Sequence, residues 1–526
     1  MTAETQTVVS NAIIIDTNPA NGEVLAELPC AGAEEVHAAV LRAQRAQPKW
    51  QAAPISQRID VLRRFQERLR DHTREVAQLI CREAGKPTAE AISTEVLVVL
   101  DAVEFCMRTA HRFLRDEPVA HGNIAMKSKR GLLTREPYGV VGIISPWNYP
   151  FSTPAVETVA ALSMGNAVVI KPSEFTPLAA LELQKLMRAA GLDPDLLQIV
   201  VGEGSAGAAL IDSGIDKLIF TGSVATGKRV AEAAARRLLP VVLELGGKDP
   251  MIVLPDADLD VVTSGALWGA FMNAGQTCLS VERGYVHRSI YEPFLQKMTE
   301  KIGRMRVGNG FDSEVEMGPL INERQLRTVE AHVNDAVQRG ARLLAGGRRL
   351  TELGPNFYAP TLLADVTGEM QVIQEETFGP VLPVAAFDTE EEAVDLANNS
   401  EFGLAASVWT SNRKRGEAMA RRIKAGTVMV NDMISCFGIS EAPHGGFKQS
   451  GIGRTHGEMG LAEMVQVRYI DSDWLPNVPK VWWYGYGRQF QRQIESMVQM
   501  TFGSGPPTRL RGMMGSLGAL RRKSRI

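Results

Sequence analysis

The stretch that decides the fold begins with ELGGK at Glu244–Lys248 and ends with NAGQTC at Asn273–Cys278. The glutamate closes an apolar run, Pro240–Leu245, that is typical of a buried strand. The cysteine follows a helical run, Leu259–Met272, on a short glycine-containing loop. Because this carboxylate and this thiol lie far apart in the sequence, only a folded chain can bring them together. A thiol with a separate carboxylate is the arrangement expected of a nucleophile and its base.

Each of the two residues also has a simpler interpretation. A lone cysteine such as Cys278 is most often a small buried hydrophobic residue. A glutamate at a strand end, such as Glu244, is usually a solvated or capping carboxylate. The two residues become specific only together, with the sequences that flank them.

Before this stretch, apolar strands alternate with amphipathic helices from Gly139 onward. The alternation predicts an α/β fold with a parallel sheet covered on both faces by helices. We expect strands at 139–144, 167–170, 197–201, 217–220 and 241–245, and helices at 153–164, 176–190 and 225–238. Ligands of such sheets bind at the carboxyl ends of the strands.

Several candidate ligand-binding segments follow those strand ends. Phe220–Gly227 reads as a strand, a Gly/Ser turn and a helix N-terminus that suits a pyrophosphate, with an ordinary capped helix as the alternative. Gly202–Gly207 matches GxGxxG, but no acidic residue closes a following strand, so a tight turn fits at least as well. Lys171–Glu174 can bond ribose hydroxyls or form a surface ion pair. Ser145–Pro150 holds an asparagine that is either a turn residue or an N–H donor to an oxyanion.

A second alternation follows the ELGGK sequence. Strands are expected at 251–254 and 427–430, and helices at 256–272, 290–302 and 323–338. The segment Glu375–Pro380, read locally, is an acidic turn. The loop 433–444 carries Cys436, Phe437 and His444.

Length and composition limit the number of domains, the partners and the compartment that can be expected. A chain of 526 residues is too long for one ordinary core, so two or more domains are expected. With 45% hydrophobic and 22% charged residues and a net charge of −3, it has a globular balance and no general attraction for nucleic acid. Five scattered cysteines, an odd number, favour a reducing, cytoplasmic compartment, and the histidine and cysteine spacing predicts no metal site. No secretory signal or spanning run is visible.

The ends of the chain have their own patterns. A hairpin is expected at 11–29, helices at 56–71 and 88–113, and a β-rich excursion at 118–137 whose partner is a final strand at 464–470.

The tail from Asp471 contains three of the seven tryptophans, and after Glu495 it has basic but no acidic residues. It fits a wrap over a subunit interface, which we favour, or a basic amphipathic segment on an anionic membrane surface.

Taken together, these motifs resemble those of the aldehyde dehydrogenase superfamily over about residues 8–473. Its members are NAD(P)-dependent enzymes that oxidise aldehydes through a cysteine thioester. The resemblance implies two Rossmann-like parallel-sheet domains and a β-arm that forms a homodimer or homotetramer. It places the cofactor-binding domain at 8–117 and 138–246, the catalytic domain at 247–454, the arm at 118–137 and 455–473, and a C-terminal extension at 474–526.

The resemblance also implies roles for residues. Cys278 is the nucleophile, Asn148 binds the oxyanion, and Glu244 activates water. The implied cofactor is NAD, with NADP as the alternative, because Glu174 should repel a 2′-phosphate. The implied cofactor-binding residues are Trp147, Lys171, Ser173, Glu174, Gly204, Gly222, Ser223, Gly227, Glu376 and Phe378.

The expected function is therefore oxidation of an aldehyde to a carboxylic acid with water as the final acceptor. Two alternatives stay open: transfer of the acyl group to coenzyme A, against which Glu244 argues, and a catalytically silent scaffold. Two positions depart from the commoner family patterns. His444 stands where an aromatic residue is usual, and Val156 stands where relatives that oxidise succinate semialdehyde often place an arginine. The second departure favours an apolar or uncharged aldehyde.

Overall fold

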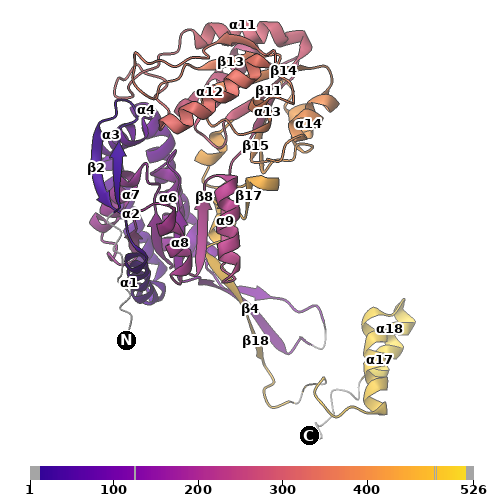
Figure 1. The fold of residues 1–526 in the computed structure, drawn as a ribbon. Coiled ribbons are helices and arrows are strands. Elements are labelled where there is room, and N and C mark those ends of the chain that lie inside the picture. The colour runs from indigo at the N-terminus through magenta and orange to yellow at the C-terminus, as the bar shows by residue number, and fades with distance from the viewer. Residues whose placement is uncertain (1–11, 124–125, 479, 481, 517–526) are drawn as a thin grey trace, which may run out of the picture. The chain divides into compact units, whose positions relative to one another are not determined.

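The computed structural model describes residues 12–123, 126–478, 480 and 482–516. The chain divides into two compact units. The first unit comprises Met1–Phe113 and Pro137–Gln466, and the second comprises Leu114–Glu136 and Val467–Ile526. The first unit contains two largely parallel sheets, which confirms the expected fold class (Figure 1).

The six-stranded sheet of the first unit has the order β17-β9-β8-β5-β6-β7. Its strands are β5 (Val140–Ile144), β6 (Ala167–Lys171), β7 (Leu197–Ile199), β8 (Lys217–Thr221), β9 (Val241–Glu244) and β17 (Gly451–Ile452). Strands β5 to β9 run parallel, and β17 pairs antiparallel at the edge. Both β5 and β6 are buried along their whole length, as apolar strands covered on two faces must be.

Helices pack against this sheet and against one another (Figure 1). They are α1 (Ala33–Ala52), α2 (Ile55–Asp71), α3 (Thr73–Ala84), α4 (Thr88–Ala91), α5 (Leu97–Phe113), α6 (Ser152–Ser163), α7 (Pro177–Ala189), α8 (Gly204–Asp212) and α9 (Val224–Ala235). The long helix expected at 88–113 is present, but a π-helical turn at Ile92–Val96 interrupts it. The expected hairpin is β1 (Ile13–Thr17) paired antiparallel with β2 (Val24–Pro29).

The seven-stranded sheet has the order β12-β13-β14-β11-β10-β15-β16. Its strands are β10 (Asp249–Val253), β11 (Val281–His287), β12 (Arg342–Ala345), β13 (Thr361–Ala364), β14 (Val381–Phe387), β15 (Ala405–Trp409) and β16 (Thr427–Val430). Only β12 is antiparallel to its neighbour. The helices of this part are α10 (Leu259–Phe271), α11 (Tyr291–Ile302), α12 (Glu323–Gln338), α13 (Gln371–Gln374), α14 (Glu390–Asn398), α15 (Arg413–Ala420) and α16 (Gly457–Ala462).

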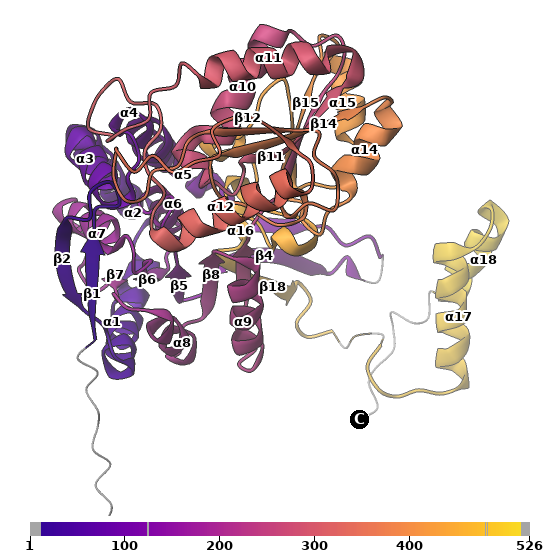
Figure 2. The same cartoon turned by 45° about the horizontal axis from the view of Figure 1, so that its top comes forward.

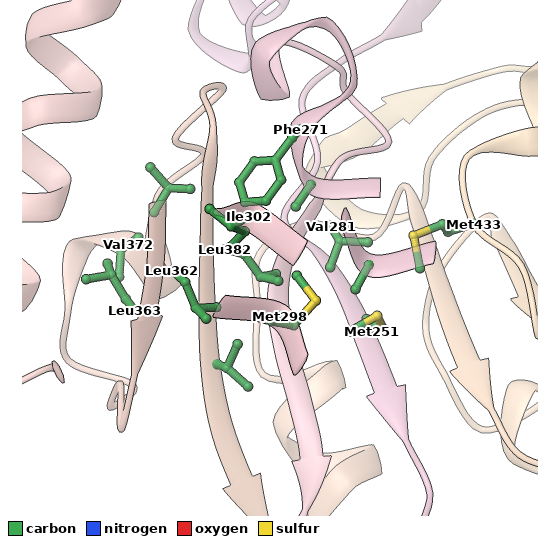
Figure 3. Packing of buried hydrophobic residues seen from close by; sticks show 14 of the residues in the cluster. Met251, Phe271, Val281, Met298, Ile302, Leu362, Leu363, Val372, Leu382 and Met433 are labelled. Atoms are coloured by element: carbon green, nitrogen blue, oxygen red, sulfur yellow. The ribbon is translucent and has the colours of Figure 1, made fainter. Parts of the chain in front are cut away.

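A large hydrophobic core joins the seven-stranded sheet to its helices. Figure 3 shows side chains from β10, β11, β13 and β14 meeting those of α10 and α11. Met251, Phe271, Met298 and Leu382 are all essentially fully buried in it. This core fixes α10, and therefore fixes the loop that follows α10.

The second unit holds a three-stranded sheet and a helical hairpin. The sheet order is β18-β4-β3, with β3 (Glu117–Val119), β4 (Lys129–Pro137) and β18 (Val465–Asp473), as expected for the arm and its last strand. Helices α17 (Arg488–Phe502) and α18 (Pro506–Ser516) pack closely on each other. A Cβ on Gly512 would lie 2.2 Å from the Met500 nitrogen, so the glycine permits this contact. Helix α17 was not expected, and Leu517 and Leu520 of the proposed amphipathic segment lie outside the described residues.

Within the described part of the chain, every helix is too short or too polar to cross a bilayer. Figure 2 turns the molecule so that the seven-stranded sheet comes forward. The carboxyl ends of β5, β8 and β9 lead into Trp147–Asn148, Gly222–Ser223 and Gly246–Gly247. The predicted site residues therefore follow strand ends, where ligands of parallel sheets bind.

Candidate active site

A cavity of about 540 Å³ brings many of the predicted site residues together. Its wall combines residues after β5, β8 and β9 of one sheet with the loop between α10 and β11 of the other. The predicted residues that line it are Trp147, Asn148, Gly222, Ser223, Glu244, Cys278, Glu376 and Phe378. The predicted residues Lys171, Ser173, Glu174, Gly204 and Gly227 are not part of this wall.

Cys278 is placed by a left-handed turn between α10 and β11. Asn273, Ala274 and Gly275 have φ angles of 52°, 53° and 71°, a region that L-residues other than glycine rarely enter. Side-chain bonds hold the turn: Asn273 Nδ2 donates to the carbonyl oxygens of Asn148 (3.0 Å) and Gln276 (3.1 Å). Glycine is required at 275, because a Cβ there would lie 2.1 Å from the Gly379 oxygen. The backbone geometry of this turn therefore sets the position of the Cys278 thiol.

The turn is anchored from outside as well. The backbone N–H of Asn273 donates to the Glu90 carboxylate at 3.1 Å, and the backbone N–H of Ile321 donates to Gln276 Oε1 at 2.9 Å. The Tyr149 and Thr277 hydroxyls are 2.8 Å apart. Sequence reasoning missed these supports, because each joins segments that lie far apart in the chain.

Asn148 lies beside the same turn. Its Nδ2 group donates to the Gln276 carbonyl oxygen at 2.9 Å, and the side chain is buried. An asparagine amide carries two N–H donors, so one bond to the turn leaves the second for the cavity that Asn148 lines. This arrangement is compatible with the expected role of an oxyanion donor.

Glu244 ends β9 and is buried. Neither of its carboxylate oxygens has a hydrogen-bond partner among the described residues. Burial raises the pKa of Glu244 well above its ordinary value, the Glu157 carboxyl raises it further, and Arg454 opposes the rise. A buried carboxyl group without partners is costly to keep and is characteristic of a reactive position.

His444 lies beside Glu244 in the wall of the cavity. The distance from His444 Nε2 to Glu244 Oε2 is 3.7 Å, and both side chains are buried. The structure thus places His444 next to the expected base. Of the loop 433–444, Phe437 lines the cavity, while Cys436 is buried outside the wall.

The electrostatics of the thiol favour the protonated form. Burial raises the pKa of Cys278 well above its ordinary value, and the carboxyl groups of Asp249, Glu376 and Glu244 raise it further. Reaction at the thiol therefore requires removal of a proton, because the thiolate is the nucleophile.

The loop that carries Glu376 and Phe378 is held by a buried ion pair. Glu282 accepts hydrogen bonds from the backbone N–H groups of Thr377 (2.7 Å) and Phe378 (2.8 Å), and it pairs with Lys248. Glu376 accepts from the Gly247 N–H at 3.0 Å, and burial raises the pKa of Glu376 to about 8. Lys248 belongs to the quoted ELGGK sequence, but its role depends on Glu282, which the sequence did not single out.

The cavity and its surroundings have the chemistry that a nicotinamide dinucleotide needs. Trp147 and Phe378 form an aromatic wall, with ring centroids 5.4 Å apart. Ser223 caps α9 by accepting from the Thr226 N–H at 3.3 Å, so the helix N-terminus faces the cavity with its positive end. Lys171 lies 3.3 Å from Glu174, a pair with donors and acceptors for ribose hydroxyls. These residues fit the expected cofactor.

The two remaining predicted glycines differ in their surroundings. Gly227 is needed for packing, because a Cβ there would lie 2.5 Å from Leu245. Gly204 begins α8 in open space, where a Cβ would meet no atom within 4 Å. In the described chain no cluster of three or more His, Cys, Asp or Glu residues could hold a metal ion.

The chain is similar to known proteins over most of its length. The model of the aldehyde dehydrogenase family matches residues 8–470. A protein from Mycobacterium ulcerans, provisionally named an NADP-dependent succinate-semialdehyde dehydrogenase, is 41% identical over 452 residues, which cover 85% of this chain and 86% of that one. The mitochondrial succinate-semialdehyde dehydrogenase of Arabidopsis thaliana is 39% identical, with 88% of this chain and 86% of that protein covered. The NAD+ complex of an aldehyde dehydrogenase from Bacillus cereus matches with a TM-score of 0.84 and 36% identity, and covers 88% of this chain and 93% of that one.

Proposed function

The chain belongs to the aldehyde dehydrogenase family, and from that premise we propose that Cys278, Asn148 and Glu244 carry out its reaction. The family match makes it an NAD(P)-dependent oxidoreductase that acts on aldehydes. The observation that carries the proposal is the shared cavity, in which a thiol and a partnerless carboxyl group from different sheets both line the wall.

In the first half-reaction the Cys278 thiol gives up its proton to solvent in the cavity, and the sulfur attacks the aldehyde carbon to form a thiohemiacetal. The negative charge develops on the carbonyl oxygen, and the Asn148 amide and the Cys278 backbone N–H stabilise it there. NAD(P)+, when bound, would accept the hydride that leaves the former aldehyde carbon as the C=O bond re-forms, and acylated Cys278 would remain. Trp147, Phe378, Glu376, Gly222 and Ser223, which line the cavity, would hold that cofactor.

In the second half-reaction Glu244 removes a proton from water, and the resulting hydroxide attacks the thioester carbon of acylated Cys278. The C–S bond breaks and the carboxylic acid leaves. Hydrolysis is favoured over transfer to coenzyme A because Glu244 lines the cavity with both oxygens free. A silent scaffold would have no chemical reason to keep this partnerless carboxyl group buried.

We propose a neutral aldehyde as substrate, with succinate semialdehyde as the second candidate because two relatives carry that name. A carboxylated substrate needs a cationic partner, and Val156 lines the cavity where such relatives often have arginine. Among the lining residues, all in the described chain, Arg324 is the one lysine or arginine. Its neighbour Gln325 in α12 donates to the Thr377 and Phe378 carbonyl oxygens of the loop proposed to bind the cofactor.

The proposal is tested by NADH and NADPH formation with purified enzyme over a panel of neutral and carboxylated aldehydes. We expect higher kcat/KM for neutral aldehydes and for NAD. Cys278→Ser should abolish turnover while NAD binding persists, and Glu244→Gln should release about one equivalent of NADH and then stall. Full turnover by either variant, or a clear preference for succinate semialdehyde, would contradict the corresponding assignment.

We also propose that the chain forms a homodimer or homotetramer through the sheet of the second unit. Its strand β18 exposes Val467 and Tyr469, apolar side chains suited to burial against another copy.

The tail hairpin, α17 and α18, carries a second proposal, a peripheral contact with an anionic membrane. Phe502, Leu510 and Met514 are exposed on it, and the four arginines of the described hairpin, Arg488, Arg492, Arg509 and Arg511, supply positive charge. All five cysteines are unpaired, which supports a reducing compartment such as the cytoplasm.

A further inference from the structure

Two histidines in the cavity wall have no part in the reaction proposed above. His444 and His456 are both buried, and both line the cavity. Phe437 packs against the two rings, with centroid distances of 5.3 Å to His444 and 4.7 Å to His456. His444 Nδ1 and His456 Nε2 have no hydrogen-bond partner among the described residues. Burying an imidazole nitrogen without a hydrogen-bond partner costs free energy, so such a nitrogen calls for a functional explanation.

The backbone holds His444 in place against Glu244. His444 and Thr455 exchange two backbone hydrogen bonds of 2.8 Å each. Within the segment that they close, β17 pairs antiparallel with β9, and Gly451 lies opposite Glu244. Glycine at 445 lets this segment approach, because a Cβ there would lie 3.0 Å from Glu244 Oε1. These pairings therefore hold the backbone of His444 close to Glu244.

We propose that His444 accepts from Glu244 the proton that Glu244 removes from the hydrolytic water. The inference rests on the proposed function, because it assigns the next step for that proton. The 3.7 Å separation of Nε2 and Oε2 is longer than a hydrogen bond, and contacts between acid–base groups commonly shorten when substrate is bound. His444 is a positioning residue in this scheme, since it acts on the substrate only through Glu244.

The proton balance is simple. Water loses a proton to Glu244 Oε2, its oxygen bonds to the thioester carbon, and the sulfur leaves with the electron pair of the C–S bond. The proton then passes from Glu244 to His444 Nε2, and the imidazolium releases a proton to the cavity that His444 lines. Glu244 returns to the carboxylate for the next turnover, and no oxidant or additional reactant is needed.

The other titratable and charged groups around Glu244 have no free acceptor site. Burial raises the pKa of Glu157 to about 8, so at neutral pH it mostly holds its own proton. Glu463 is paired with Lys217 at 2.5 Å, and Arg454 has no acceptor atom. Burial, with His456 and Arg454 as further causes, lowers the pKa of His444 to about 3, and burial lowers that of His456 to about 4. His444 is therefore neutral at rest and has an unprotonated ring nitrogen. Because the pKa of Glu244 is raised and that of His444 is lowered, the transfer is uphill and the imidazolium is short-lived, so it passes its proton on to the cavity.

The test separates acylation from hydrolysis without requiring the natural aldehyde. p-Nitrophenyl acetate acylates the thiol, and intact-protein mass spectrometry after removal of excess ester follows loss of the acetyl group. We expect His444→Phe, which keeps the ring shape, and His444→Ala to acylate like wild type but lose the acetyl group about tenfold more slowly. Added imidazole should accelerate His444→Ala, whose missing side chain leaves room for it, and should leave His444→Phe unchanged.

The controls distinguish this inference from the proposed function. Cys278→Ser should not retain an acetyl thioester, and Glu244→Gln should keep the acetyl group with or without imidazole. If Glu244→Gln hydrolyses like wild type, the assignment of the base itself fails. If both controls behave as expected and His444→Phe deacylates at the wild-type rate, only the role of His444 is overturned. Slow hydrolysis in His444→Ala that imidazole does not accelerate would also overturn it, because that loss would be structural.

Discussion

Glu157 shares the environment of Glu244, and the two carboxyl groups influence each other. Both are buried, and the ionised form of Glu157, whose own pKa burial raises to about 8, is the second largest cause of the raised pKa of Glu244. Like charges held close in a dry site disfavour ionisation of the second group. The chain therefore keeps its proposed base protonated to a higher pH than burial alone would.

Replacing Glu157 by glutamine should make Glu244 a base at lower pH. Removal of the neighbouring charge lowers the pKa of Glu244, and since the carboxylate is the active form, the acid limb of the turnover profile moves to lower pH. The measurement is kcat against pH between about 6 and 10. Glu157→Asp, which keeps the charge, serves as the control. An unmoved limb in Glu157→Gln would show that the two groups do not interact during turnover.

The sequence pointed to the candidate reacting residues more readily than to the residues that support them. Cys278 and Glu244 were predicted together because their flanking motifs are specific, and both line the same cavity. The contacts of Asn273 with Asn148 and of Ile321 with Gln276 were not predictable, because each depends on how separate segments pack. The place of His444 was missed for the same reason: only the pairing of β17 with β9 brings it to Glu244.

At the scale of elements, local signals decided which boundaries were predictable. Helix α12 begins and ends as expected, because Asn322 caps it by accepting from the Gln325 N–H at 2.9 Å. The expected start of α10 at Asp256 is wrong: Asp258 is the cap, and Asp256 instead accepts from Thr410 and Ser411. Helix α17 was missed, although its apolar residues recur every fourth position, at Phe490, Ile494, Val498 and Phe502.

The loop of Glu376 and Phe378 depends on the pair Lys248–Glu282, whose side chains are almost fully buried. Glu282→Gln should lower the free energy of unfolding by about 3 kcal/mol, because it leaves the Lys248 charge unpaired in the interior. It should also raise the KM for NAD, because the loop loses a charged acceptor for its N–H groups. Denaturant unfolding and cofactor titration measure the two effects.

The double variant Lys248→Met with Glu282→Gln is the matched control for that pair. It removes both charges, so most of the stability should return. A double variant as unstable as Glu282→Gln alone would contradict an ion-pair origin of the loss.

At the scale of the whole molecule, the first unit contains every residue of the candidate site. Removal of residues 474–526 should therefore leave kcat and KM within about twofold of the full chain. The truncated chain keeps β18 to Asp473, so its oligomeric state by light scattering should also be unchanged. On the proposal of a membrane contact, full-length protein co-sediments with vesicles containing phosphatidylserine and the truncated form does not, whereas the favoured wrap over a subunit interface predicts no difference. Equal sedimentation of the two forms would remove the membrane role of the tail.

The proposed base ends a strand of the six-stranded sheet, and the proposed nucleophile follows a helix of the seven-stranded sheet. On this assignment the two halves of the catalytic cycle depend on different sheets. A lineage could lose hydrolysis by drift at one sheet while the other continued to load acyl groups. Such a descendant would hold an acyl thioester on its cysteine until a small nucleophile attacked it. The architecture leaves the final acceptor open to evolutionary exchange while oxidation itself is preserved.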